Sequence, residues 1–277
     1  MKDRYADLHV HTYYSDSTLS PRQVVETALK VGLSAIGITD HDCVAGIKES
    51  IDAAWGQPLE IIPGIELSVD HKGQEVHMLG YFIDWQADWF RKKISVVAES
   101  RHQRIFKMIE LLKKEKINIE ADEVFKLAGK GTVGRLHLAL ALLKKRKIYS
   151  IQEAFDRYIG HGKPCYVGHV MFNAREAIEN IVKAGGVPVL AHPHVMGKDS
   201  FIDDFLELGL KGIEVYHSDH NESIQRKYRR IARKKGLLVT GGSDCHGLGK
   251  GRILMGDVMV KYDVVESLKM KSKGYRA

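Results

Sequence analysis

The sequence of 277 residues has little cysteine and no long apolar run. Its three cysteines, Cys43, Cys165 and Cys245, show no CxxC spacing, which excludes a disulfide framework and argues against a cysteine-based zinc site. No stretch approaches the roughly 20 apolar residues that cross a bilayer, and no apolar signal segment follows Met1-Lys2-Asp3-Arg4. We therefore expect a cytoplasmic protein with reduced thiols and no membrane partner.

The formal net charge of +7 is concentrated in two segments. From Arg91 to Lys147, 16 Lys or Arg residues stand against 6 Asp or Glu residues, and Arg226 to Lys235 holds seven basic residues in ten. Two interpretations are open. The segments are solvated helix faces, or they create a positive field that attracts phosphates or a short nucleic acid.

The stretch Asp7-Leu8-His9-Val10-His11-Thr12 contains two histidines two residues apart at the end of a predicted strand. Side chains on a strand repeat their direction every two residues, so His9 and His11 face the same side. Two imidazoles on one side can chelate one cation. The stretch therefore predicts part of a metal site.

Similar polar clusters accompany the other predicted strands. They are Thr39-Asp40-His41-Asp42, Pro63-Gly64-Ile65-Glu66, Glu75-Val76-His77, Ala191-His192-Pro193-His194 and Gly242-Ser243-Asp244-Cys245-His246-Gly247. Histidines scattered through a core are the alternative, but six clusters at strand ends are typical of a site at the C-terminal mouth of a barrel-like α/β sheet.

Apolar periodicity predicts a repeating βα pattern that one segment interrupts. Strands are expected at 6–11, 34–39, 59–62 and 76–82, with helices at 20–32 and 46–55. From 88 to 158 the pattern is helical throughout, and the βα rhythm resumes at 174. We therefore predict an α/β barrel formed by residues 1–86 and 166–277, with an all-helical insertion, or cap, at 87–165.

Imidazole and carboxylate donors without thiolate suit Mn²⁺, Zn²⁺ or Fe. The supply of such donors exceeds what one tetrahedral ion needs, which favours a cluster of two or three ions. Metals about 3.5–4 Å apart generate hydroxide near neutral pH and clamp the oxygens of a displacement at phosphorus. With a basic segment nearby, an anionic phosphoester is the expected substrate.

The motifs Asp7 to Thr12, Thr39 to Asp42, Pro63 to Glu66, Ala191 to Pro193 and Gly242 to Gly247 resemble those of the PHP (polymerase and histidinol phosphatase) family over essentially the whole chain. The resemblance implies a distorted (β/α)₇ barrel with two or three divalent ions, Mn²⁺ first and Zn²⁺ or Fe next. It implies His9, His11, Glu66 and Asp244 around one metal, Glu66, His77 and His192 around a second, and Asp16, His41 and His246 around a third. Asp40 would orient a ligand.

The insertion after Tyr81-Phe82 and the segments Gly134-Arg135-Leu136-His137 and Gly162 to Val167 resemble the stand-alone branch of that family. This branch includes 3′,5′-nucleoside bisphosphate phosphatase and a 5′→3′ exoribonuclease, and it implies that Arg135 and His137 bind phosphate. An ion pair at a helix start is the alternative role for Arg135.

Three loop residues complete the list of expected site residues. Lys163 and His194 are further candidates for substrate binding, although packing or solvent exposure would explain them equally well. Among His194, His217 and His220, we prefer His220 as the general acid that protonates the leaving oxygen.

We therefore expect a metal-dependent phosphoesterase acting on small nucleotides, with 3′,5′-nucleoside bisphosphates as the leading class. The alternatives are a 5′→3′ exoribonuclease on short RNA and a histidinol phosphate phosphatase, whose cationic substrate a positive cap would repel. A nucleic-acid binding module with a structural metal is the non-enzymatic alternative, which the filled set of ligand positions disfavours.

Overall fold

The computed structural model describes residues 3–129 and 131–273. Within these residues one mixed sheet runs in the order β8-β7-β6-β4-β3-β2-β1-β9, and β5 pairs with β3. Its strands are β1 (Tyr5–Val10), β2 (Ala35–Ile38), β3 (Glu60–His71), β4 (Gln74–Tyr81), β5 (Phe172–Asn173), β6 (Val187–Leu190), β7 (Gly212–His217), β8 (Leu238–Gly242) and β9 (Val260–Lys261).

The sheet curls until its first and last long strands meet. His11 N donates to the carbonyl of Cys245 at 3.1 Å, and Cys245 N donates to the carbonyl of His9 at 3.3 Å. A parallel bridge pairs Val10 with Cys245, three residues beyond the end of β8. This seam between β1 and the segment after β8 nearly closes the sheet, so the predicted distorted barrel is confirmed.

Gly242 makes this closure sterically feasible. A Cβ at this position would lie 2.3 Å from the backbone nitrogen of His9 and 2.5 Å from the Cβ of His9. Only a residue without a side chain allows β8 to approach β1 this closely.

Strands β3 and β4 form an antiparallel hairpin, which the βα pattern did not predict. β3 continues to His71, well beyond the predicted end at residue 62, and Ser68 pairs with His77. Lys72 and Gly73 connect the strands with φ of 54° and 78°, the backbone of a two-residue hairpin turn. Because β4 runs opposite to β1 and β2, its first residues lie at the mouth where those strands end.

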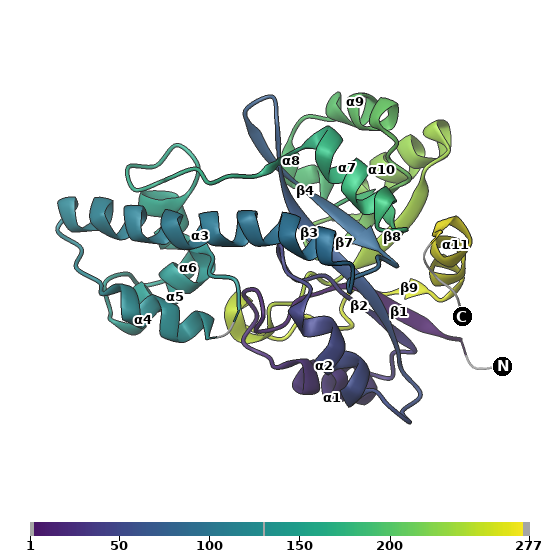
Figure 1. Ribbon diagram of the computed structural model, residues 1–277, viewed down its shortest axis with the longest axis horizontal. Coiled ribbons are helices and arrows are strands. Elements are labelled where there is room, and N and C mark those ends of the chain that lie inside the picture. Colours follow the sequence, from purple (N-terminus) through teal and green to yellow (C-terminus); the bar gives the residue numbers. More distant parts are fainter. Residues whose placement is uncertain (1–2, 130, 274–277) are drawn as a thin grey trace.

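Helices pack around the barrel (Figure 1). They are α1 (Pro21–Val31), α2 (Ala45–Ala53), α7 (Ala174–Lys183), α8 (Pro193–Met196), α9 (Phe201–Leu208), α10 (Glu222–Lys235) and α11 (Asp263–Lys271), with a 3₁₀ turn, η2, at Gly247–Lys250. The predicted start of α1 is confirmed: Ser20 Oγ accepts from Gln23 N at 3.3 Å, and Gln23 Oε1 accepts from Ser20 N at 2.9 Å.

A helical insertion follows β4 and projects from the barrel (Figure 1). It consists of α3 (Asp88–Lys114), α4 (Ala121–Ala128), α5 (Arg135–Lys144), α6 (Ile151–Ala154) and the π-helical turn η1 (Phe155–Ile159). The first half of α3 packs into the barrel core through Phe90, Ile94 and Val97, whereas Ile105, Met108 and Leu112 belong to a separate core shared with α4 and α5. Within the described ranges, no helix combines the length and apolar content of a membrane span.

Candidate metal centre

Glu66 occupies the centre of the barrel mouth. Its side chain is only 1% exposed, although a buried carboxylate is costly unless it has charged or polar partners. Five imidazoles supply those partners: His9 Nε2 (3.2 Å), His11 Nε2 (3.3 Å) and His41 Nδ1 (3.2 Å) on Oε2, and His77 Nδ1 (2.9 Å) and His192 Nε2 (3.0 Å) on Oε1. The structure therefore gathers five predicted ligands around a sixth.

The first predicted ion position is surrounded by His9, His11, Glu66 and Asp244. Their ligand atoms all lie within 4.8 Å of one another, and all four residues are buried. Asp244 Oδ1 is 3.4 Å from His9 Nε2 and 3.1 Å from His11 Nε2. As the two-residue spacing predicts, the imidazole of His9 in β1 and that of His11, just after β1, point to the same side.

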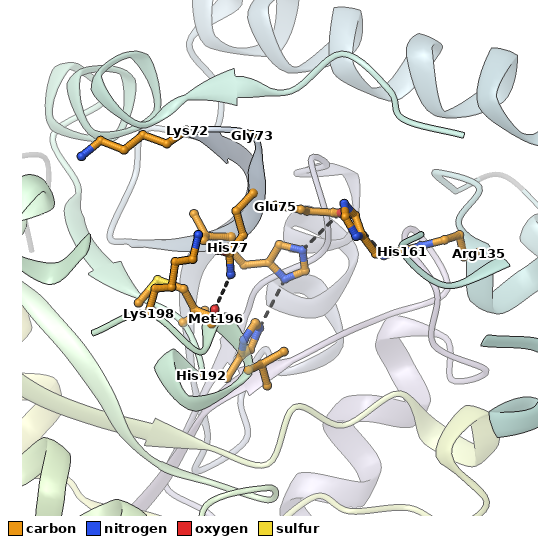
Figure 2. Close-up of a pocket in the computed structure, with 13 residues that line it drawn as sticks. Lys72, Gly73, Glu75, His77, Arg135, His161, His192, Met196 and Lys198 are labelled. Carbon is orange, nitrogen blue, oxygen red and sulfur yellow. Dashed lines mark hydrogen bonds and ion pairs between the residues drawn. The ribbon is translucent and has the colours of Figure 1, made fainter. Parts of the chain in front are cut away.

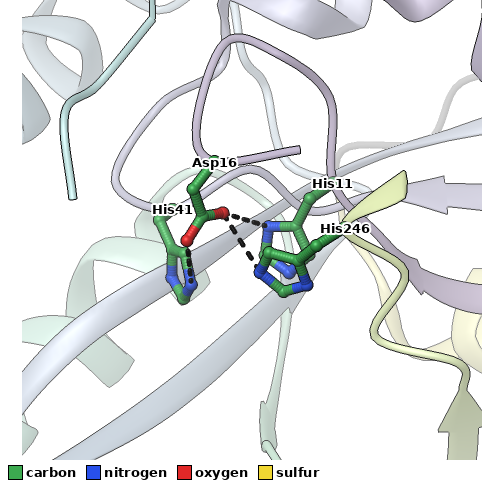
Figure 3. Close-up of side chains that lie close together, drawn as sticks. All are labelled: His11, Asp16, His41 and His246. Carbon is green, nitrogen blue, oxygen red and sulfur yellow. Dashed lines mark ion pairs between the residues drawn. The ribbon is translucent and has the colours of Figure 1, made fainter. Parts of the chain in front are cut away.

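The third predicted position lies beside the first (Figure 3). Asp16, from the loop between β1 and α1, points its carboxylate between three rings. Its Oδ1 is 3.1 Å from His246 Nε2 and 3.8 Å from His11 Nδ1, and its Oδ2 is 3.8 Å from His41 Nε2. His11 thus lies between the first and third groups, which the sequence did not indicate.

The second predicted position is formed by Glu66, His77 and His192. His77 Nδ1 lies 3.3 Å from His192 Nε2, and both nitrogens face Glu66 Oε1. His192 has a left-handed backbone with φ of 23°, a strained conformation for a residue with a side chain. Its backbone nitrogen donates to Glu214 Oε2 at 2.9 Å, which helps to hold this conformation.

The chemistry of these atoms fits divalent cations. His11 Nε2, Asp16 Oδ1 and His41 Nδ1 are buried and make no hydrogen bond. Burial alone would raise the pKa of Glu66, but the surrounding histidines hold it well below its usual range. Burial opposes the charged form of His11, yet Asp244 and Glu66 raise its pKa to about 9. A proton held there must leave when a cation binds, so metal binding would release protons.

Asp40 supports a predicted ligand without touching it. Its carboxylate accepts from Thr12 N and Thr12 Oγ1, both at 2.7 Å, and from Ser15 Oγ at 2.6 Å. Ser15 Oγ in turn lies 3.3 Å from His11 Nδ1. Asp40 thus positions His11 through Ser15. Gly46 leaves room for this carboxylate, since a Cβ there would lie 2.5 Å from Asp40 Oδ2.

Two residues of β7 also support the centre, a role that was not expected for either of them. Glu214 Oε1 is 3.0 Å from His9 Nδ1, and His217 Nε2 is 3.3 Å from Asp244 Oδ2. Together with His9 they form a further cluster of potential ligands. A signal for Glu214 existed: a carboxylate within the apolar run Gly212-Ile213-Glu214-Val215 needs a buried partner.

Of the predicted substrate residues, Arg135 lines a cavity together with His77 and His192. It is the first residue of α5, and its Nη2 lies 3.4 Å from Glu75 Oε2. The alternative role of Arg135, an ion pair at the start of a helix, is therefore also present, with Glu75 as the partner. His137 is buried and accepts from Gly134 N at 3.1 Å through Nδ1, which caps α5.

The three loop residues lie elsewhere. Lys163 is exposed after η1, and His194 is exposed in α8. His220 is buried, with Nδ1 2.8 Å from the carbonyl of Val215 and its ring 5.3 Å from that of His217. None of these three residues is among those that line the cavities at the metal centre.

Two cavities meet at His77 and His192. The first, about 520 Å³, carries cations and is lined among others by Lys72, Glu75, Arg135, His161 and Lys198 (Figure 2). The second, about 740 Å³, also reaches Asp16, His41, Glu66, Asp244 and His246, and its far wall is largely apolar with Leu136, Leu143, Tyr149, Ile151 and Phe155. A phosphate at the metal centre would therefore have a cationic space on one side and an apolar space on the other.

Known proteins share this arrangement of sequence and fold. The PHP domain model matches residues 7–183. A 3′,5′-nucleoside bisphosphate phosphatase of Chromobacterium violaceum is 31% identical over 251 residues, covering 88% of each chain. A 5′-3′ exoribonuclease of Haemophilus influenzae is 32% identical over 245 residues, covering 87% of this chain and 89% of the relative.

Among solved structures, a putative metal-dependent phosphoesterase from Bifidobacterium adolescentis superimposes with a TM-score of 0.89 at 30% identity, covering 96% of both chains. Sequence match, fold and clustered ligands agree with one another. The chain belongs to the PHP family and is a metal-dependent hydrolase of phosphate esters.

Proposed function

We propose that the chain removes phosphate from 3′,5′-nucleoside bisphosphates. The observation that carries the proposal is the position of Arg135, whose guanidinium shares a cavity with His77 and His192 at the edge of the metal centre. An arginine fork binds phosphate oxygens in a fixed geometry. A substrate that places one phosphate at the metal centre and a second on Arg135 must carry two phosphates on one small molecule, as a 3′,5′-nucleoside bisphosphate does.

The nine clustered residues would hold two or three divalent ions, with Mn²⁺ as the leading candidate. When bound, such ions supply an activated water and neutralise charge on the phosphate. The chain's own residues orient these ligands: Glu214 holds His9, and Asp40 holds His11 through Ser15. The apolar wall with Tyr149 and Phe155 would accept the base.

The geometry supports a different role for His220 from the one we expected. His220 is buried beside His217 and is not among the residues that line either cavity, so proton donation from His220 to a leaving oxygen has little geometric support. We infer that His220 positions His217, which in turn contacts Asp244. For Lys163, His194 and His137, phosphate contact likewise has little geometric support, and Arg135 remains as the proposed phosphate ligand.

A 5′→3′ exoribonuclease activity is the second candidate. Between Arg91 and Lys147 the chain has 16 basic residues and 6 acidic residues, and this positive charge favours binding of a longer anion such as RNA. Both activities use the same centre and differ in how much nucleic acid the chain accepts.

The test compares phosphate release from adenosine 3′,5′-bisphosphate, AMP, histidinol phosphate and a 5′-phosphorylated RNA by Mn²⁺-loaded protein. Arg135→Gln should lower kcat/KM for the bisphosphate by about 10- to 100-fold, the effect of one charged hydrogen bond, and should affect AMP much less. Arg157→Gln is the matched control, because Arg157 is an exposed cation of the same insertion that pairs with Glu153.

Efficient turnover of AMP that Arg135→Gln leaves unchanged would refute the proposal. Turnover of RNA without release from the bisphosphate would instead establish the exoribonuclease. Salt-dependent RNA binding with no turnover of any substrate would favour the non-enzymatic binding module.

A further inference from the structure

A third cavity, about 630 Å³, continues the cationic cavity away from the metal centre. Gly73, Glu75 and His161 line both cavities, so the two adjoin. Beyond this shared wall the third cavity is lined by Arg104, Lys107, Tyr166 and His169, among others. None of these four residues has a role in the function proposed above.

Arg104 is a buried cation with an unused donor. It is 3% exposed, its Nε donates to the carbonyl of Val167 at 2.6 Å, and its Nη1 lies 3.1 Å from His169 Nδ1. Its Nη2 is buried and has no hydrogen-bond partner. A buried donor left unpaired is costly, and a charged one more so, which favours an acceptor in the adjoining space.

His169 supplies a second unused donor to the same cavity. Because an arginine can only donate, His169 Nδ1 accepts from Arg104, and the ring proton must be on Nε2. This Nε2 is also buried without a partner. Burial and the charges of Arg101 and Arg104 lower the pKa of His169 to about 3, so the ring is neutral at neutral pH.

The carboxylates in the cavity already have partners. Glu75 faces Arg135 Nη2 at 3.4 Å, and Asp70 Oδ1 accepts from Gly73 N at 3.2 Å. The ring of Tyr166 is near both arginines: the guanidinium carbon of Arg104 lies 5.3 Å and that of Arg135 5.7 Å from the ring centroid. One aromatic ring thus lies within cation–π distance of both guanidinium groups, and each of these arginines lines one of the adjoining cavities.

We propose that Arg104 and His169 form a subsite for a further phosphate of an oligonucleotide. The proposal rests on the function proposed above, in that the reacting phosphate lies at the metal centre and the next one on Arg135. A third phosphate then reaches the donors of Arg104 and His169. A nucleoside bisphosphate has no group for this subsite, whereas a dinucleotide with both terminal phosphates does.

The test measures binding rather than turnover. Calorimetric titration of the metal-loaded protein compares non-hydrolysable analogues of two ligands that differ only in the third phosphate: pApA, with a free 3′-hydroxyl, and pApAp. We expect the wild-type protein to bind pApAp about tenfold more tightly than pApA, the effect of one charged hydrogen bond. Arg104→Gln and His169→Leu should each bring this ratio close to one.

Lys92→Gln is the control, since it removes one exposed positive charge from the same helix α3 but lies outside the cavity and should keep the wild-type ratio. Arg104 also holds Val167, so a melting curve checks that its variant folds, and His169→Leu tests the subsite independently. A wild-type ratio near one, or a ratio that both variants preserve, would overturn the proposal. Neither result depends on which ester the metal-loaded enzyme hydrolyses, so failure here is distinguishable from failure of the proposed function.

Discussion

Arg101 and Asp42 form a buried ion pair that fastens the helical insertion to the metal centre. Arg101 Nη2 lies 2.8 Å and Nε 2.9 Å from Asp42 Oδ2, and both side chains are almost fully buried. Asp42 follows His41 directly and also accepts from Ser68 N at 2.8 Å. Ser68 lies two residues after Glu66 on β3. One cation of α3 therefore fixes the two segments that carry His41 and Glu66.

Arg101→Ala should destabilise the protein by about 3–5 kcal/mol, because it leaves the carboxylate of Asp42 buried without its charged partner. Urea unfolding of the metal-free protein measures this loss. Arg91→Ala is the control, since the exposed pair of Arg91 and Asp88 should contribute less than about 1 kcal/mol. Equal effects of the two substitutions would show that the Arg101 pair does not anchor the insertion.

Glu214→Gln should weaken metal binding by about 10- to 100-fold, as loss of the carboxylate behind a ligating histidine typically does. Glu214 contacts His9 Nδ1 and the backbone of His192, so both the first and the second ion positions would be affected. Competition with a fluorescent chelator gives the Mn²⁺ affinity. Glu207→Gln, a change of the same kind on helix α9 outside the centre, should leave the affinity unaltered. An unchanged Mn²⁺ affinity in Glu214→Gln would show that Glu214 does not support the metal ligands.

Gly242→Ala should cost about 1–3 kcal/mol and reduce the metal content, since the new Cβ collides with the backbone of His9 at the barrel seam. Unfolding curves and elemental analysis of dialysed protein measure the two effects. Gly168→Ala is the comparison, because a Cβ at Gly168 meets no atom within 4 Å. Full metal content in Gly242→Ala would mean that β1 can shift without disturbing its ligands.

His169 should make folding sensitive to acid. Its pKa is about 3 in the folded protein and about 6.5 in the unfolded chain, so the unfolded state binds more protons between these values. Its stabilising effect is complete above pH 6.5 and is lost as the pH falls toward 3. When the pH falls from 7 to 5, the free energy of unfolding of the metal-free protein should decrease by about 1 kcal/mol less in His169→Gln than in the wild type, as measured by urea unfolding. Identical losses would show that His169 is freely protonated when folded.

Local patterns predicted the elements and much of the centre well. Alternation placed His9, in β1, and His11, just after it, on one side, and the helix expected at 20–32 matches α1, which Ser20 and Gly32 cap at its two ends. The nine expected ligands, Glu66 among them, lie together at the barrel mouth, because most of them occur at or near strand ends and strand ends meet there.

Features that depend on distant parts of the chain were not predictable in the same way. The antiparallel course of β4 follows from the two-residue turn at Lys72-Gly73, a weak signal next to the longer βα pattern. The position of His220 beside His217 is set by how β7 and α10 pack, which residue type and spacing do not encode. Arg101, one of 16 basic residues in its segment, is distinguished only by its burial against Asp42.

The seam between β1 and the segment after β8 also has a consequence for biosynthesis. The proposed ligands are spread from His9 to His246, so a growing chain displays imidazoles and carboxylates long before the last two ligands have been translated. Until the seam closes, those early groups form an open chelator without the geometry that restricts which ions fit. The geometry that selects among metals therefore exists only in the closed barrel, and not in the growing chain.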